Sequence, residues 1–166
     1  MRYVLLLLAL PLMASAQQPQ QPPPCASEPY RHFDFWLGEW EVRSTADSTL
    51  AGTNSIQAIE NGCGVREVWN STGGGSGQSL NYYDPVAEEW RQRWVSGCCV
   101  IEIAGGWDGE TMTLVGTVDY RNGTSFPFRG IWTPLETGQV RQLFEQSADD
   151  GETWQVWFDG LYTRAE

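Results

Sequence analysis

The sequence predicts an all-β protein, an antiparallel up-and-down β-barrel of about ten strands whose N-terminal segment plugs one end. Short runs of alternating apolar and polar residues recur along the chain, and almost no segment has a helical period. Short turns such as Asn122-Gly123 and Asp150-Gly151 separate the runs, which is typical of a meander. Closure into a barrel removes both sheet edges, because the last strand can pair with the first. A two-sheet sandwich is the alternative, although it usually needs longer crossovers.

The turns assign the two ends of the expected barrel. If the first strand starts at the bottom, turns after odd-numbered strands lie at the top and turns after even-numbered strands lie at the bottom. The aromatic stretch before the first strand then lies at the bottom, where it can cap the barrel. The expected strands are residues 39–44, 53–60, 64–69, 78–83, 89–95, 99–104, 111–118, 125–132, 139–146 and 153–163.

The N-terminus carries the features of a secretory signal peptide over residues 1–16. Arg2 supplies positive charge, residues 4–10 form an apolar core, and Ala14-Ser15-Ala16 is a small-residue cleavage site. The apolar run is too short to span a membrane. Residues 17–27 follow as a Pro/Gln-rich, disordered tether, and residues 28–166 form a single barrel domain. We therefore expect a secreted or periplasmic protein, cleaved near Ala16.

Composition limits the partners of the domain. The formal net charge is −11, and it becomes −12 when Arg2 is removed with the leader. Such a charge disfavours nucleic acid and anionic lipid as partners. Nothing after the leader is apolar for long enough to span a membrane. The nine Trp residues indicate either a heavy barrel core or an aromatic pocket, because Trp is large and amphipathic.

Four cysteines in an oxidising compartment predict a disulfide. Cys63 is expected at the bottom of the barrel, whereas Cys98 and Cys99 are expected at the top, roughly 15–20 Å away. A disulfide requires Cα atoms within about 7 Å of each other. Cys25 precedes the plug, so we predict Cys25–Cys63, with Cys98 and Cys99 as a vicinal pair or free thiols. Pairing of Cys25 with Cys98 or Cys99 is the alternative.

One aromatic stretch, His32-Phe33-Asp34-Phe35-Trp36-Leu37-Gly38-Glu39-Trp40, resembles the N-terminal signature of a family of secreted bacterial proteins of unknown function. The signature has the form Phe-Asp-Phe-Trp-Leu-Gly-x-Trp, and further similar stretches extend to about Arg164. That family is similar to the lipocalin and fatty-acid-binding (calycin) barrels, which also begin with Gly-x-Trp after a short closing helix. The resemblance implies a barrel with an internal cavity and carries no established activity.

A second pattern, from Ser147 to Trp154, resembles the Asp-box of sialidase propeller blades. There the motif repeats and stands away from catalysis. Its Asp side chains accept backbone N–H bonds and its Gly takes positive φ, so a single copy predicts a hairpin turn and not a sialidase.

Alternation along the strands predicts which side chains face the barrel interior. On residues 89–95, Trp90, Gln92 and Trp94 share one face. Glu67 is expected inward on its strand, and Arg129 and Arg141 outward, unless a bulge or a one-residue slip reverses them. The predicted interior is aromatic with a few polar points that either orient a ligand or bond to one another in a filled core. The candidate ligand-binding residues are Glu67, Trp69, Tyr82, Trp90, Gln92, Trp94, Phe128 and Gln142.

No cofactor or metal site is predicted. His32 is the single histidine, and it is expected to be a structural residue of the plug. An axial haem ligand is the alternative. Ligand spacing for a metal is absent from the sequence, as is a Gly-x-Ser-x-Gly nucleophile motif.

Three functions remain open on the sequence. The first is non-catalytic binding of a small, partly apolar or aromatic ligand inside the barrel, with the segments 45–52, 71–77 and 119–124 gating the mouth. The second is an isomerase or hydrolase for a hydrophobic substrate, with Glu67 as general base. The third is a filled barrel that acts as an envelope interaction protein.

Overall fold

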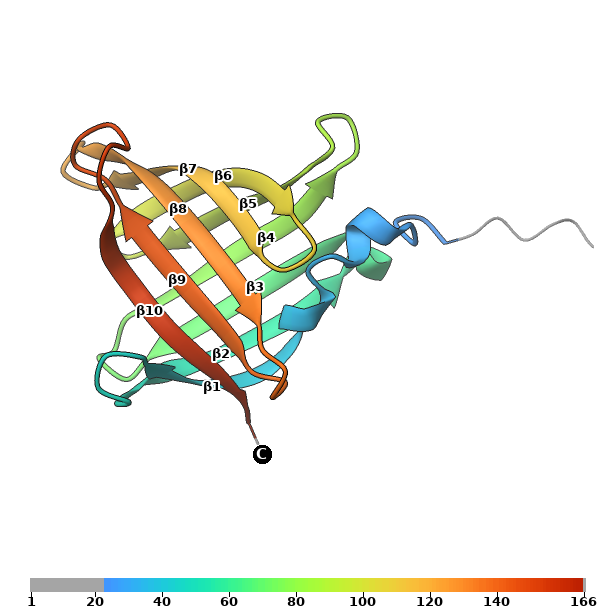
Figure 1. The fold of residues 1–166 in the computed structure, drawn as a ribbon, viewed down its shortest axis with the longest axis horizontal. Coiled ribbons are helices and arrows are strands. Elements are labelled where there is room, and N and C mark those ends of the chain that lie inside the picture. The colour runs from blue at the N-terminus through green and yellow to red at the C-terminus, as the bar shows by residue number, and fades with distance from the viewer. Residues whose placement is uncertain (1–22, 166) are drawn as a thin grey trace, which may run out of the picture.

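The computed structural model describes residues 23–165, which form a closed barrel of ten antiparallel strands (Figure 1). Each strand pairs with its neighbours in the chain, and the last strand pairs with the first to close the barrel. The predicted fold class is confirmed, and each expected strand is present with ends moved by a few residues. The strands are β1 Gly38–Ser44, β2 Leu50–Ile59, β3 Gly64–Ser71, β4 Ser76–Asp84, β5 Glu89–Ser96, β6 Cys99–Trp107, β7 Met112–Tyr120, β8 Ser125–Pro134, β9 Val140–Gln146 and β10 Gln155–Arg164.

The predicted signal peptide lies outside the described residues, as does the tether up to residue 22. No helix between residues 23 and 165 is long and apolar enough to cross a membrane.

Alternate residues of each strand face inward, as the patterning predicts for most strands. Trp90 and Gln92 of β5 are buried, and so are Val140, Gln142 and Phe144 of β9. Arg129 and Arg141 face outward, where they form ion pairs with Glu145 and Asp159.

The predicted orientation of β4 is wrong. Tyr82, predicted to line the interior, is 37% exposed on the outer wall, as is Leu80 on the same face of the strand at 46%, while Ser79 and Asn81 are buried. The rule that the apolar face points inward fails here because the interior is polar: Asn81 Nδ2 donates to the Ser79 hydroxyl at 2.8 Å and to the Val65 carbonyl at 3.1 Å.

The plug fills the bottom half of the barrel. It contains two short 3₁₀ turns, η1 Glu28–Arg31 and η2 Asp34–Trp36, and Figure 1 shows it in blue at the end opposite the β9–β10 turn. Phe33 and Trp36 are fully buried and stack with ring centroids 4.9 Å apart. Phe33 also meets the edges of Trp90 and Trp132 at 5.4 and 5.1 Å. Aromatic packing of this kind closes the bottom to solvent.

Hydrogen bonds from indole groups fix the plug to the barrel wall. Trp90 Nε1 donates to the carbonyl of Pro29 at 2.9 Å, and Trp40 Nε1 donates to the carbonyl of Trp36 at 2.8 Å. The guanidinium of Arg164, at the end of β10, donates to the carbonyl of Leu37 and stacks 3.9 Å from the Trp40 ring. The first and the last strand of the barrel therefore both hold the plug.

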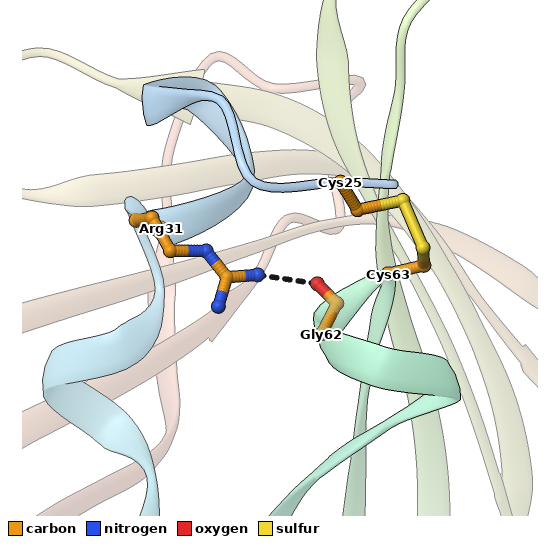
Figure 2. The surroundings of a disulfide bond; sticks show 4 residues. All are labelled: Cys25, Arg31, Gly62 and Cys63. Atoms are coloured by element: carbon orange, nitrogen blue, oxygen red, sulfur yellow. Dashed lines mark hydrogen bonds between the residues drawn. A yellow bond between two sulfur atoms is a disulfide. The ribbon is translucent and has the colours of Figure 1, made fainter. Parts of the chain in front are cut away.

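The predicted Cys25–Cys63 disulfide is confirmed, and it links the start of the plug to the β2–β3 connection (Figure 2). That connection contains η3 Glu60–Gly62, and Figure 2 shows the Arg31 guanidinium directed at the Gly62 carbonyl, to which it donates a hydrogen bond. Gly62 has φ of +87°, which favours glycine at this position. The disulfide indicates an oxidising, extracytoplasmic environment.

The Asp-box turn has the structural role that the sequence predicts. Asp149 accepts bonds from the Thr153 N–H at 2.8 Å and the Thr153 hydroxyl at 2.6 Å. These donors lower the pKa of Asp149 to about 2. Ser147 is buried and its hydroxyl accepts the Gly151 N–H at 2.8 Å. Trp154 packs against Arg129, whose guanidinium lies 4.3 Å from the ring.

Replacing both Cys25 and Cys63 by Ser should lower the free energy of unfolding by up to about 4 kcal/mol, because the bridge closes a long loop in the unfolded chain. The sequence separation that sets this loop is 38 residues. Urea unfolding followed by Trp fluorescence measures the effect. Cys98→Ser, which removes an exposed free thiol, is the control and should unfold like the unmodified protein. An unchanged unfolding midpoint in the double variant would contradict a stabilising disulfide.

Candidate functional site

The upper part of the barrel contains a cavity. A cavity of about 550 Å³ opens between the top turns, at the end opposite the plug. Pockets that bind small molecules typically measure roughly 300–1,000 Å³. The mouth is formed by Thr49, Leu50, Ala51, Ser71, Thr72 and Gly73, and the wall and floor by Glu67, Trp69, Trp94, Gln142, Phe144, Trp157, Phe158 and Tyr162.

Close approach to glycine lets two of the cavity tryptophans lie flat against the wall. Trp69 of β3 lies over Gly52 of β2, where a Cβ would come within 2.8 Å of its ring. Trp94 of β5 lies over Gly77 of β4, where a Cβ would come within 2.1 Å. A side chain at either glycine would push the indole into the space that the cavity occupies.

Glu67 is the charged group of the cavity and is 3% exposed. Its Oε1 accepts a hydrogen bond from Asn54 Nδ2 at 2.7 Å, and its Oε2 accepts one from the Ser79 hydroxyl at 2.6 Å. Glu67 takes part in none of the ion pairs found among residues 23–165. The carboxyl is thus buried with neutral hydrogen-bond donors and without a counter-charge.

A ladder of hydrogen-bonded polar side chains runs around the inner wall of the barrel through Glu67, from β5 to β9. On one side, Asn81 Nδ2 donates to Ser79 at 2.8 Å, and Gln92 Nε2 donates to Asn81 Oδ1 at 2.7 Å. On the other side, Asn54 Nδ2 also donates to the Tyr162 hydroxyl at 3.1 Å, which in turn donates to Gln142 Oε1. In order, the ladder is Gln92, Asn81, Ser79, Glu67, Asn54, Tyr162 and Gln142.

Burial governs the ionisation of this ladder. Desolvation raises the pKa of Glu67 to about 7, and the hydrogen bonds from Ser79 and Asn54 only partly oppose it. Desolvation and the nearby Glu67 charge raise the pKa of Tyr162 well above 10. Glu67 is therefore the member of the ladder that changes charge near neutral pH.

A β-bulge brings two consecutive aromatic residues to the cavity. The pairing of β10 with β9 shifts register between Val156 and Phe158, and both Trp157 and Phe158 line the cavity as a result. The Trp157 indole Nε1 donates to the Tyr120 hydroxyl at 3.0 Å, which holds the ring at the rim.

The structure brings together four of the eight sequence-predicted site residues, Glu67, Trp69, Trp94 and Gln142. Trp90 belongs to the filled lower half, where it packs on the plug, and Phe128 is fully buried against Phe144 at 5.3 Å. Gln92 is buried in the ladder below the cavity. Tyr82 lies outside. Of the predicted gating segments, 45–52 and 71–77 form the mouth, and 119–124 contributes no lining residue.

Sequence reasoning missed Trp157, Phe158, Tyr162 and Asn54. A bulge has no reliable signal in a single sequence, and two adjacent aromatic residues cannot both face inward in a regular strand. Tyr162 could have been found by continuing the alternation of β10, and Asn54 by that of β2.

The remaining chemistry-bearing side chains lie away from this cavity. His32 is in the bottom plug, where its Nε2 bonds to Glu28. Cys98 and Cys99 are free thiols at the top, with Sγ atoms 2.7 Å apart. Burial raises the pKa of Cys99 to about 11. Across residues 23–165, no group of three or more His, Cys, Asp or Glu side chains could hold a metal ion.

Comparison with known proteins adds no relative: a scan against protein-family models and a search of curated proteins both find no match for the chain.

The raised pKa of Glu67 predicts a pH dependence of stability. Its ordinary value is 4.5 and its folded value about 7, so folding favours the protonated carboxyl. The free energy of unfolding should therefore fall by about 3 kcal/mol as the pH rises from 4.5 to 7, and Glu67 should add no further change above 7. Urea unfolding at several pH values measures this, and Glu67→Gln should remove the fall.

Glu102→Gln is the matched control, because Glu102 lies on the outer wall in an exposed pair with Arg93. It should keep the pH profile of the unmodified protein. If Glu67→Gln keeps the same profile as well, the carboxyl titrates at its ordinary pKa.

Proposed function

We propose that this protein binds a small, partly apolar or aromatic ligand in the upper cavity, entering between the top turns. The observation that carries the proposal is an aromatic-lined cavity of about 550 Å³ with one buried carboxyl in its wall. Apolar walls with a few convergent polar groups are the usual composition of small-molecule sites. Trp69, Trp94 and Phe144 would bury the apolar part of the ligand, and Glu67 and Gln142 would orient it.

The distribution of packing inside the barrel supports binding over a structural role. The lower half is filled by the plug and by Trp40, Trp90 and Trp132, each at most 2% exposed. A cavity of about 550 Å³ in the upper part of the barrel supports ligand binding over the filled barrel of an envelope interaction protein.

The proposal extends to the location of the protein and to its mode of binding. We propose that the protein works in the periplasm or outside the cell and that it binds ligands in the manner of a lipocalin-like barrel. The disulfide supports the first point and the closed barrel with one plugged end supports the second.

A neutral fluorescent probe tests the binding proposal. N-phenyl-1-naphthylamine should bind with one-to-one stoichiometry and quench Trp emission, because Trp69, Trp94 and Trp157 line the cavity. Ala51→Trp fills the mouth and should weaken binding at least about tenfold. Val86→Trp adds the same ring at a bottom turn, where the side chain is 92% exposed, and should leave the affinity unchanged. If the two variants bind the probe with equal affinity, the probe binds outside the cavity. If the unmodified protein does not bind the probe at all, the proposal is refuted.

A second candidate is an enzyme with Glu67 as general base, and one observation favours it. A carboxyl whose pKa is about 7 is suited to accept protons at neutral pH. A hydrolase would release nitrophenol from medium-chain 4-nitrophenyl esters with a rate that rises through pH 7. Glu67→Gln should lower that rate about 10²–10⁴-fold. If the unmodified protein hydrolyses the esters no faster than Glu67→Gln does, the enzyme function is refuted and the binding function remains.

A further inference from the structure

The cavity lining determines which charge a ligand can carry, and this inference rests on the binding function proposed above. Glu67 is the one acidic residue that lines the cavity, and none of the lining residues is Lys, Arg or His. We propose that the cavity selects a positively charged ligand, an organic ammonium with an apolar body, whose cation lies between the Glu67 carboxylate and the surrounding aromatic rings.

The first support is the missing counter-charge of Glu67. A carboxylate that is 3% exposed is costly to ionise unless an opposite charge accompanies it. Asn54 and Ser79 each supply one neutral donor, and no basic side chain of the described residues pairs with the carboxyl. An ammonium group in the cavity would supply this charge. An anionic ligand, such as a fatty acid, would meet a like charge and no cation.

The second support is the number of aromatic rings around the same space. A cation within about 6 Å of a ring centroid is attracted by the negative face of the ring, most strongly for Trp. Trp69 and Phe158 meet edge to face at 6.0 Å, and Phe144 lies 6.2 Å from Trp157. Six aromatic side chains line the cavity, namely Trp69, Trp94, Phe144, Trp157, Phe158 and Tyr162.

The third support is the charge of the turns at the open end of the barrel. The top turns, residues 45–49, 72–75, 97–98, 121–124 and 147–154, contain four acids and one base. The acids are Asp47, Asp149, Asp150 and Glu152, and the base is Arg121. An excess of negative charge around a mouth raises the local concentration of cations and speeds their entry.

The groups packed around Glu67 do not change charge near neutral pH, so the pH dependence of ligand binding should come from Glu67 itself. Asn54 faces it from β2, Ser79 from β4 and Tyr162 from β10, and Tyr162 is the one titratable group among them. Because the pKa of Tyr162 is raised well above 10, only Glu67 changes charge near neutral pH. A cation must then displace the Glu67 proton below pH 7.

Phenyltrimethylammonium and its neutral isostere tert-butylbenzene test the proposal by displacing N-phenyl-1-naphthylamine from the cavity. The cation keeps its charge at every pH, so only the protein titrates. At pH 8 it should bind at least about tenfold tighter than tert-butylbenzene, although the neutral compound is more hydrophobic. Its affinity should weaken about tenfold for each pH unit below 7, while that of tert-butylbenzene stays constant. Benzenesulfonate should not displace the probe.

Glu67→Gln should bring the ratio of the two affinities close to one, and Glu102→Gln on the outer wall should keep the ratio of the unmodified protein. The pH series on the unmodified protein decides the question even if Glu67→Gln does not fold. Equal binding of cation and isostere with no pH dependence would overturn the cation preference and leave the binding function standing. Failure of the probe and both compounds to bind would overturn both.

Discussion

The volume inside a ten-strand barrel is the constraint on which the rest of this structure depends. A barrel of about eight strands is filled by its own side chains, and each added strand widens the interior. Protein interiors are otherwise packed as densely as organic crystals, so the extra space must be occupied or remain a cavity. Here the lower half is occupied by a separate piece of chain, in which Phe33 and Trp36 are fully buried. The upper half receives no such segment.

The anchoring of the plug explains why the two halves can differ. Its contacts are made at the bottom rim by the Cys25–Cys63 disulfide, by Arg31 on the Gly62 carbonyl and by Arg164 on the Leu37 carbonyl. These attachments join the plug to β10 and to the connection between β2 and β3. In the closed sheet, β10, β1, β2 and β3 follow one another in this order. At the top, hydrogen bonds such as those from the Thr72 hydroxyl to the carbonyls of Leu50 and Ala51 join neighbouring turns. The disulfide and the plug are thus at the closed end, and access is left to the open end.

The sequence was sufficient for the fold and for about half of the cavity. Strands β3, β5, β8 and β9 carry aromatic or aliphatic side chains on the inner face, so alternation placed Glu67, Trp94 and Gln142 correctly. The same rule failed on β4, because the polar ladder reverses the usual relation between apolarity and burial there. Ser79 and Asn81 face Glu67 and Gln92 inside, and Leu80 and Tyr82 face out. Where interior partners are polar, patterning within one strand cannot identify the inner face.

The position of Glu67 runs against the demands of stability, which is an argument for function in itself. An apolar side chain of similar volume would avoid the desolvation that raises the pKa of this carboxyl to about 7. The ladder offers two neutral donors, yet Asn54 Oδ1 and Gln92 Oε1 are buried without donors among the described residues, so it is itself incompletely satisfied. Buried polar groups that lower the stability of a protein concentrate at functional sites, where binding or catalysis requires them. Because Glu67 lies in the wall of the cavity, its burial there links the carboxyl to a ligand that enters from the top.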